Sequence, residues 1–115
     1  MKLADEHCVT LTKRASRVDA EDCAELLAML PDWHIVEIGG IERLERKYPM
    51  ADFARALAFT NDVGAAAEAE DHHPAILTEW GRVTVSWWTH AVRGLHRNDF
   101  IMAAQTDRLY ARATS

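Results

Sequence analysis

The sequence has few of the features that mark whole classes of protein. Its 115 residues include only two cysteines, three prolines and five glycines. Cys8 and Cys23 are too far apart for a Cys-x-x-Cys motif, and two cysteines make no disulfide scaffold, so both are predicted to be free thiols. No window approaches the roughly 20 apolar residues that cross a bilayer, and residues 1–7 turn charged where a signal peptide would be apolar. We therefore expect a cytoplasmic protein without a membrane segment.

An excess of positive charge is also lacking. The chain has 13 Lys and Arg against 18 Asp and Glu, a formal net charge of −5. Because nucleic-acid affinity depends on positive side chains that displace counterions, we expect no direct nucleic-acid ligand. The hydrophobic content of 49% and charged content of 27% are ordinary for a folded chain, and the length fits a single domain over residues 1–115.

Hydrophobic periodicity and turn signals predict a regular order of elements. The predicted elements are an arm over residues 1–15, helices near 20–30, 51–70 and 98–113, and hairpins built from 33–38 with 41–48 and from 76–80 with 83–90. Asp19 and Asn98 are the predicted N-caps of the first and last helices. Paired strands separated by a helix indicate an α+β fold, a four-stranded antiparallel sheet with helices packed on one face, in the order α-β-β-α-β-β-α. Its open face or edge would favour self-association.

Six histidines in so short a chain is the one unusual count. Three of them, His72, His73 and His90, lie in the stretch between Glu68 and Asp99. Glu68 precedes His72 by four residues, so the two side chains share a face if the helix continues that far. A carboxylate beside an imidazole favours its protonated form, which suits a general acid near neutral pH.

Simpler interpretations of the same residues exist. A His-His pair at a helix end is commonly solvated there and favoured by the helix dipole. A metal site is a further alternative, although the chain has no two histidines at i, i+4, the spacing that helical metal sites prefer. Tryptophans are core or interface residues by default, and His7, His34 and His96 are interpreted as structural or exposed.

The spacing of the whole set resembles the signature of the pterin-4a-carbinolamine dehydratase family. That pattern is Glu68, three residues, His72-His73-Pro74, five residues, Trp80, nine residues, His90, eight residues and Asp99. Flanking stretches that also resemble the family are Trp33 at the first hairpin, Tyr48 to Phe59, Val83-x-Val85, Thr89-His90 and Gly94-Leu95. Two positions depart from it: Trp80 stands where Tyr is more common, and His96 stands where relatives usually carry Thr or Ser as the cap of the last helix.

The resemblance implies an enzyme, a 4a-hydroxytetrahydropterin dehydratase of the hydro-lyase type. Such an enzyme removes water from a pterin carbinolamine to give the quinonoid dihydropterin, which supports tetrahydropterin recycling and needs no metal or other cofactor. The chemistry calls for a general acid at the C4a hydroxyl and a general base at N5.

The resemblance also implies site roles. His72, His73 and His90 would ring the pterin, Asp99 would orient a histidine or a pterin nitrogen, and Trp33 or Trp80 would wall the site. We expect His72, oriented by Glu68, to act as the acid, His90 as alternate acid or base, and His73 to position the ring.

Implied partners are a pterin substrate, a second copy in a homodimer or homotetramer, and an aromatic amino acid hydroxylase in the same pathway. The alternative function is a protein-interaction or dimerisation module that acts as a regulatory partner, with or without the activity. A metal-binding protein that uses the His-rich loop is a third hypothesis.

Overall fold

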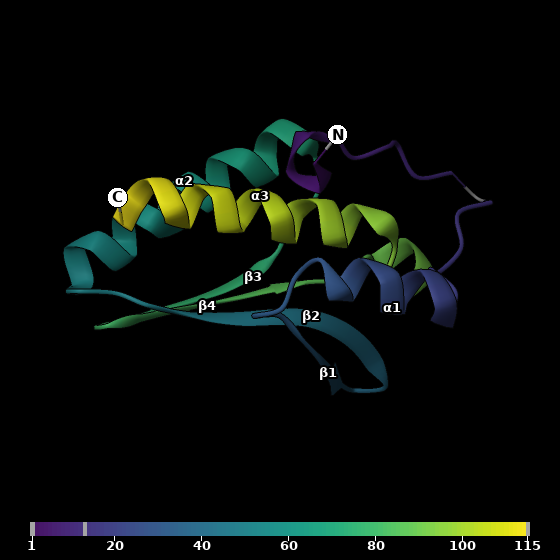
Figure 1. Ribbon diagram of the computed structural model, residues 1–115, viewed down its shortest axis with the longest axis horizontal. Coiled ribbons are helices and arrows are strands. Elements are labelled where there is room, and N and C mark those ends of the chain that lie inside the picture. The colour runs from purple at the N-terminus through teal and green to yellow at the C-terminus, as the bar shows by residue number, and fades with distance from the viewer. Residues whose placement is uncertain (1, 13, 115) are drawn as a thin grey trace.

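The computed structural model describes residues 2–12 and 14–114 of the chain. Its elements in order are η1 (Leu3–Asp5), α1 (Ala20–Ala28), β1 (His34–Ile38), β2 (Ile41–Pro49), α2 (Phe53–Glu70), β3 (Ala75–Glu79), β4 (Arg82–Trp87), η2 (His90–Val92) and α3 (Arg97–Thr114). The four strands form one antiparallel sheet in the order β1-β2-β4-β3. The three α-helices lie on one side of that sheet (Figure 1), so the predicted α+β fold is confirmed.

Side-chain caps fix where the first two helices begin. The Asp19 carboxylate accepts a hydrogen bond from the Asp22 backbone N–H at 2.8 Å, which confirms Asp19 as the N-cap of α1. Asp52 does the same for α2, accepting from the Arg55 N–H at 2.8 Å. Each cap satisfies one of the N–H groups that a helix start leaves without an intrahelical partner.

The hydrophobic core lies between the sheet and the helices. Alternate residues of the two central strands point toward the helices and are buried: Leu44, Tyr48, Val83, Val85 and Trp87. They meet the buried stripes of α2 and α3: Ala56, Phe59, Val63, Ala67, Phe100, Ile101, Met102 and Ala103. This alternation follows from the period of two along a strand, and it fixes which face of the sheet each side chain lies on.

The second hairpin is shorter than predicted. We expected its second strand to run from residue 83 to 90, but β4 ends at Trp87 and His90 begins the short helix η2. The chain turns because Thr89 forms a bridge with Gly94, in which the Thr89 N–H donates to the Gly94 carbonyl at 2.8 Å. His90 therefore lies in a tight loop and not on a strand.

The predicted cap of the last helix is wrong by two residues. His96, and not Asn98, is the N-cap of α3: its Nδ1 accepts from the Asn98 N–H at 3.0 Å. Asp99 returns the bond, since its carboxylate accepts from the His96 N–H at 2.9 Å. Together the two bonds form a variant of the capping box, in which an imidazole nitrogen replaces the usual hydroxyl and accepts from the second helical residue rather than the third. Asn98 lies inside the helix, where it is 2% exposed.

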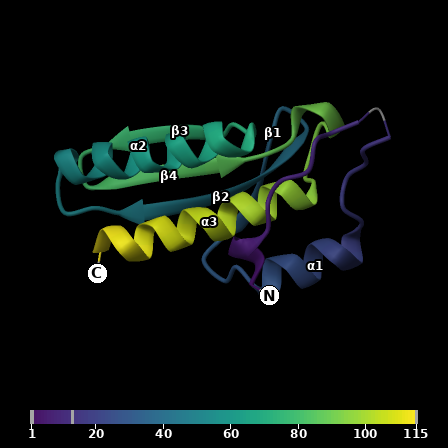
Figure 2. The same cartoon turned by 90° about the horizontal axis from the view of Figure 1, so that it is seen from above.

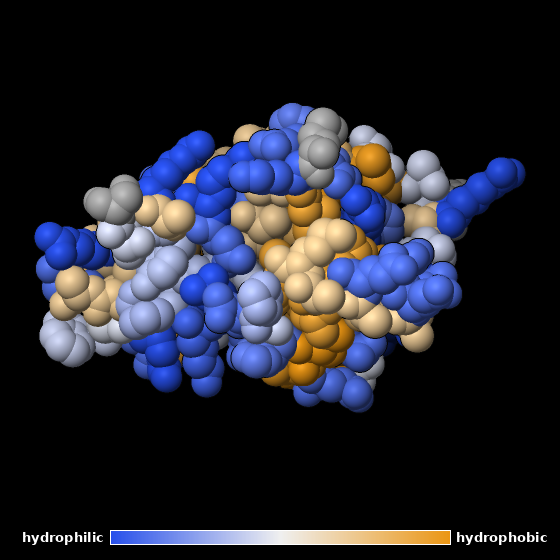
Figure 3. Space-filling model, viewed as in Figure 1, coloured by the Kyte–Doolittle hydropathy of each residue, from blue (hydrophilic) through white to orange (hydrophobic). Residues whose placement is uncertain are grey.

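The N-terminal arm, residues 2–12, crosses over α3 (Figure 2), as the predicted surface arm requires. Arg97 and Arg108 of α3 hold it through ion pairs of 2.7 Å with Glu6 and Asp5. The face drawn in Figure 3 is mostly hydrophilic, with an apolar strip near its middle beside α1. Among the helices of the described segments, none is both long and apolar enough to cross a membrane.

Candidate functional site

Strand pairing brings the histidine segments to one end of the sheet. Ala75 at the start of β3 is paired with Ser86 near the end of β4. The His72-His73 loop that precedes β3 therefore lies next to the segment from Trp87 to His90 that leaves β4. Two stretches separated in sequence thus supply the three histidines from neighbouring backbone segments.

A left-handed residue at the end of α2 sets the directions of His72 and His73. Asp71 has φ of 50° and ψ of 43°, a conformation that Asp adopts more readily than most residues. The His72 N–H donates to the Ala67 carbonyl at 3.1 Å and the Asp71 N–H to the Glu68 carbonyl at 3.2 Å. These two bonds are those of a Schellman motif, which reverses the chain at the helix end. As a result His72 is buried and His73 is exposed.

His72 is held by a buried carboxylate. Its Nε2 donates to Asp99 Oδ1 at 2.6 Å, and the two side chains are 8% and 0% exposed. The second oxygen of Asp99 accepts from the Thr89 hydroxyl at 2.7 Å and from the His96 N–H at 2.9 Å. A buried carboxylate needs such partners, and here they leave Asp99 oriented toward the imidazole.

The predicted pairing of Glu68 with His72 is wrong. Glu68 instead accepts a hydrogen bond from His73 Nε2 at 2.5 Å, and both side chains lie well exposed. The reason is that α2 ends at Glu70: beyond it the chain reverses, so the i, i+4 relationship of a continuous helix no longer applies. Asp99, which we expected to orient a histidine or a pterin nitrogen, is hydrogen-bonded to His72.

Two tryptophans at the end of β4 contact histidines from opposite faces of the sheet. The Trp87 ring, which faces the helices, is stacked on His72 with centroids 5.9 Å apart and planes inclined by 10°. The next residue, Trp88, faces the other way and lies 5.1 Å from the His90 ring. The Arg43 guanidinium lies over Trp88, 3.8 Å from the ring centroid. Aromatic surface therefore adjoins both His72 and His90.

The structure places the two predicted aromatic walls elsewhere. Trp33 is 2% exposed in the core, with its ring edge toward Tyr48 and its Nε1 donating to Asp107 at 3.0 Å. Trp80 is 75% exposed at the turn between β3 and β4, the opposite end of β3 from His73. Five residues at roughly 3.3 Å each separate the two ends of that strand by about 17 Å.

Three residues that lie against His72 or Asp99 were not predicted as part of the site. Trp87 could have been predicted to face the helices, because it alternates along the strand with Val83 and Val85 and therefore lies on the same side of the sheet. Thr89 was noted only within the Thr89-His90 stretch that resembles the family, and no role was predicted for it. His96 was interpreted as structural or exposed, yet it packs near the site: burial lowers its pKa, His72 lowers it further, and Asp99 acts in the opposite direction.

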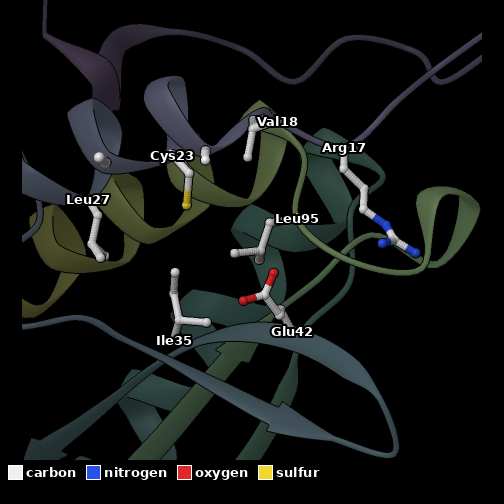
Figure 4. A pocket seen from close by; sticks show the side chains of 9 residues that line it. Arg17, Val18, Cys23, Leu27, Ile35, Glu42 and Leu95 are labelled. Carbon is white, nitrogen blue, oxygen red and sulfur yellow. The ribbon is translucent and has the colours of Figure 1, made fainter.

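Two cavities were compared as possible substrate sites. The larger, about 420 Å³, lies between α1 and the β1–β2 hairpin and is lined mainly by apolar side chains such as Val18, Leu27 and Leu95 (Figure 4). Its lining contains none of the three histidines. A smaller cavity of about 250 Å³ is lined by His72 together with Asp71, Glu70, Asn98 and residues 8–11 of the arm. Of these two cavities, only the smaller has one of the three histidines, His72, in its lining.

Metal ligation gains no support from the side-chain geometry. Across residues 2–12 and 14–114, the structure has no group of three or more His, Cys, Asp or Glu side chains arranged to hold a metal ion. Both cysteines are free, as predicted. Burial, with the negative charges of Glu70 and Asp99 nearby, raises the pKa of the Cys8 thiol to about 12, so it stays neutral.

Comparison with known proteins gives a consistent result. The family model described as pterin 4 alpha carbinolamine dehydratase matches residues 16–109. A Gloeobacter violaceus protein is 57% identical over 111 residues, covering 96% of each chain, and a Microcystis aeruginosa protein is 56% identical over 109 residues, covering 95% of this chain and 94% of that one. Both are named as candidate pterin-4-alpha-carbinolamine dehydratases.

A solved structure agrees with the sequence relatives. The crystal structure of a Brucella melitensis protein, described as a transcriptional coactivator/pterin dehydratase, superposes with a TM-score of 0.73 at 29% identity. The match covers 82% of this chain and 98% of that one.

Proposed function

The chain belongs to the pterin-4a-carbinolamine dehydratase family, and from this premise we propose that it removes water from a 4a-hydroxytetrahydropterin to form quinonoid dihydropterin. The observation that carries the proposal is that His72, which lines a cavity beside a second histidine segment, is hydrogen-bonded to the buried carboxylate of Asp99. A solvated His-His pair at a helix end would not need a buried carboxylate bonded to one of its histidines.

The reaction is an elimination without a change of oxidation state. The C4a–oxygen bond breaks and the hydroxyl leaves as water once a proton has been added to it. N5 loses its proton, and the electron pair of the N–H bond forms the new C4a=N5 double bond. A general acid and a general base therefore suffice, and imidazoles serve both roles near neutral pH.

His72 is assigned as the acid toward the departing hydroxyl. Because its Nε2 donates to Asp99, its Nδ1 is the nitrogen left to hold the transferable proton. The hydrogen bond to the buried Asp99 carboxylate fixes the orientation of the imidazole that gives that proton. This replaces the predicted orienting role of Glu68 toward His72.

His90 and His73 complete the set. His90 is exposed next to Trp88 and is assigned as the alternate acid or base. His73, held by Glu68, is assigned to position the ring. Because the pair of His73 and Glu68 is exposed, it contributes only about 0–1 kcal/mol. His73 can therefore give up Glu68 and bond to a pterin nitrogen at small cost.

The aromatic contacts are reassigned from the observed geometry. Trp88, which is half-buried beside the exposed His90, is the aromatic surface proposed for the pterin ring, whereas Trp87 is fully buried and stacks on His72 inside the core. The burial of Trp33 disfavours its predicted contact with substrate, because it leaves almost no ring surface accessible. Trp80 would meet a substrate only in a site of a neighbouring copy of the chain.

Self-association is part of the proposal. β3 is an edge strand, and the side chains of Leu77 and Trp80 on and beside it are 56% and 75% exposed. An exposed edge with apolar side chains favours pairing with another chain, consistent with the expected homodimer or homotetramer. Sedimentation equilibrium on the purified protein measures the state directly, and a monomer at micromolar concentration would reject this part.

The physiological setting follows from the chemistry. Quinonoid dihydropterin is the form from which a tetrahydropterin is regenerated, so we place the protein in cytoplasmic pterin recycling beside an aromatic amino acid hydroxylase. The proposed reaction itself calls for no metal or organic cofactor.

A second candidate function is favoured by one observation. The Brucella melitensis relative is described as a transcriptional coactivator as well as a pterin dehydratase. A regulatory partner role would use exposed helix surface, such as Phe53 and Leu57 of α2, which are 46% and 45% exposed, and would not need the buried pair of Asp99 and His72. The chain retains that pair, which favours catalysis as the primary role.

The discriminating experiment has two arms. In the first, 4a-hydroxytetrahydropterin is generated in situ and quinonoid dihydropterin formation is followed by stopped-flow absorbance with and without the protein. In the second, the tagged protein is recovered from its own cells and its bound proteins are identified. Acceleration in the first arm supports the dehydratase; no acceleration together with stoichiometric recovery of a transcription factor supports the regulatory partner.

A further inference from the structure

The N-terminal arm reaches the site although it lies outside the family match. The match begins at residue 16, whereas the arm comprises residues 2–12. Its middle part is bonded to the last turn of α2 and the first turn of α3, the two helix ends that carry His72 and Asp99. The arm is thus attached to the site itself and not only to a remote surface.

Glu70 holds one part of the arm. Its Oε1 accepts from the Cys8 backbone N–H at 2.6 Å and its Oε2 accepts from His7 Nδ1 at 2.9 Å. Burial raises the pKa of Glu70, but the hydrogen bonds from His7 and Cys8 outweigh it and keep the pKa below its usual value. The carboxylate is therefore an ionised acceptor with both oxygens engaged by the arm, and its side chain is only 12% exposed.

Asn98 holds the next residue of the arm by its main chain. Its Oδ1 accepts from the Val9 N–H and its Nδ2 donates to the Val9 carbonyl, each at 3.0 Å. A side-chain amide that satisfies both main-chain groups of one residue fixes the path of the backbone whatever the side chain there. Asn98 is buried beside Asp99, so adjacent residues of α3 bind the arm and orient His72.

The result is a cavity shared between the arm and the histidine loop. About 250 Å³ in volume, it is lined on one side by Cys8, Val9, Thr10 and Leu11, and on the other by Glu70, Asp71, His72 and Asn98. A ligand whose reacting carbon lies at His72 would extend toward the arm residues. The arm is a wall of the cavity in which the acid is placed.

We propose that residues 8–11 form the part of the substrate site that meets the substituent on the pterin ring, and that they select which substituents are accepted. This inference rests on the proposed dehydratase function. The acid and base residues lie inside the matched segment and act on the ring common to all pterins, whereas the substituent is the part of the substrate that varies. The arm supplies a wall of the cavity from outside the segment that the family model matches.

The lining predicts the class of substituent. Thr10 offers a hydroxyl, Val9 and Leu11 are apolar, and Glu70 and Asp71 bring two carboxyl groups to the other side. A neutral alkyl or hydroxyalkyl group fits that lining. A phosphate or glutamate group would meet like charge in a partly enclosed space, where repulsion is stronger than in open water.

The test compares three carbinolamines, carrying a methyl, a hydroxyalkyl and a phosphate-bearing substituent, in the full-length protein. Thr10→Lys should lower KM for the phosphate-bearing substrate relative to the methyl one by about tenfold, the size of one well-placed charge contact of about 1.4 kcal/mol. Leu11→Ala should raise KM for the hydroxyalkyl substrate relative to the methyl one about threefold or more, with the change in KM and not in kcat. Arg108→Gln is the matched control, because it releases Asp5 of the arm far from the cavity lining.

Each outcome has a definite meaning. Shifted KM ratios in Thr10→Lys and Leu11→Ala, with Arg108→Gln like the wild type, support the arm as the selecting wall. Unchanged ratios in both wall variants, while the wild type turns over all three substrates at enzymatic rates, overturn the inference and leave the dehydratase function intact. A wild-type protein that accelerates none of the three dehydrations overturns the proposed function and this inference with it.

Discussion

Asp99 lies 2.6 Å from His72 Nε2, and the same carboxylate closes the capping box at the start of α3 through the His96 N–H. One buried side chain therefore does two things: it begins a helix and it orients the proposed acid. Residues that are 27 positions apart in sequence become dependent on each other, so the site is assembled only when α3 is correctly started.

Removing both proposed proton-transfer groups should abolish most of the activity. In the double variant His72→Ala/His90→Ala we expect dehydration to fall by about 10² or more, the range that a positioned acid or base contributes. Stopped-flow absorbance of quinonoid dihydropterin measures it. Thermal unfolding of the same variant shows whether the fold is retained, and a folded variant with wild-type turnover would remove the histidine mechanism.

Glu68 should matter less than its sequence position suggests. Because its contact with His73 is exposed, Glu68→Gln should change kcat/KM by less than about fivefold, equivalent to an exposed ion pair of about 1 kcal/mol or less. Steady-state kinetics at several pterin concentrations would separate KM from kcat. A loss of a hundredfold in kcat would show that Glu68 acts on the chemistry after all.

The histidine cap predicts a pH-dependent stability. Burial lowers the pKa of His96 below 6.5, so the unfolded chain binds the proton more readily and the cap is fully present only above that pH. As pH falls through the window below 6.5, Nδ1 takes up a proton and can no longer accept from the Asn98 N–H. His96→Ser supplies a cap that does not titrate.

The expected result is a difference between two curves. Between pH 7.5 and pH 5 the wild type should lose about 1 kcal/mol of unfolding free energy relative to His96→Ser, the usual value of an N-cap. Urea unfolding at each pH gives both values. Parallel pH curves for the two proteins would mean that the His96 imidazole does not act as the cap in solution.

Replacing Asp71 with glycine should increase the stability of the protein. Its φ of 50° is strained for a residue with a Cβ, so Asp71→Gly should raise the free energy of unfolding by up to about 1 kcal/mol. Asp71→Ala, which keeps a Cβ and loses the short polar side chain, should instead lower it. Denaturant unfolding ranks the three proteins, and glycine less stable than alanine would contradict the left-handed conformation.

Much of the fold was predictable because local signals agreed with the final packing. Asp19 before acidic residues, the Gly39-Gly40 turn and the alternation in β2 and β4 each act within a few residues of the chain. These signals depend on helix and strand periods, which tertiary structure did not override here. The length of β4 failed because the Thr89–Gly94 bridge that ends it carries no local signature.

The sequence singled out the histidines and carboxylates of the candidate site, but neither their pairing nor the aromatic residues beside them. His72, His73, His90, Glu68 and Asp99 were all singled out, but which carboxylate holds which histidine depends on one backbone angle at Asp71. The sequence alone does not distinguish a helix that continues to His72 from a chain that reverses at Asp71. The contact of Trp87 with His72 and the return of the arm onto Asn98 are likewise products of tertiary packing.

The most direct test of the central claim is the activity of Asp99→Asn. Asparagine retains an oxygen that can accept from Thr89 and the His96 N–H, so the capping box persists while the negative charge facing His72 is lost. A charge-assisted hydrogen bond of about 1.5–3 kcal/mol corresponds to a 10- to 100-fold fall in kcat at neutral pH. With wild-type urea stability, such a fall is the predicted result, and an unchanged kcat would contradict the account.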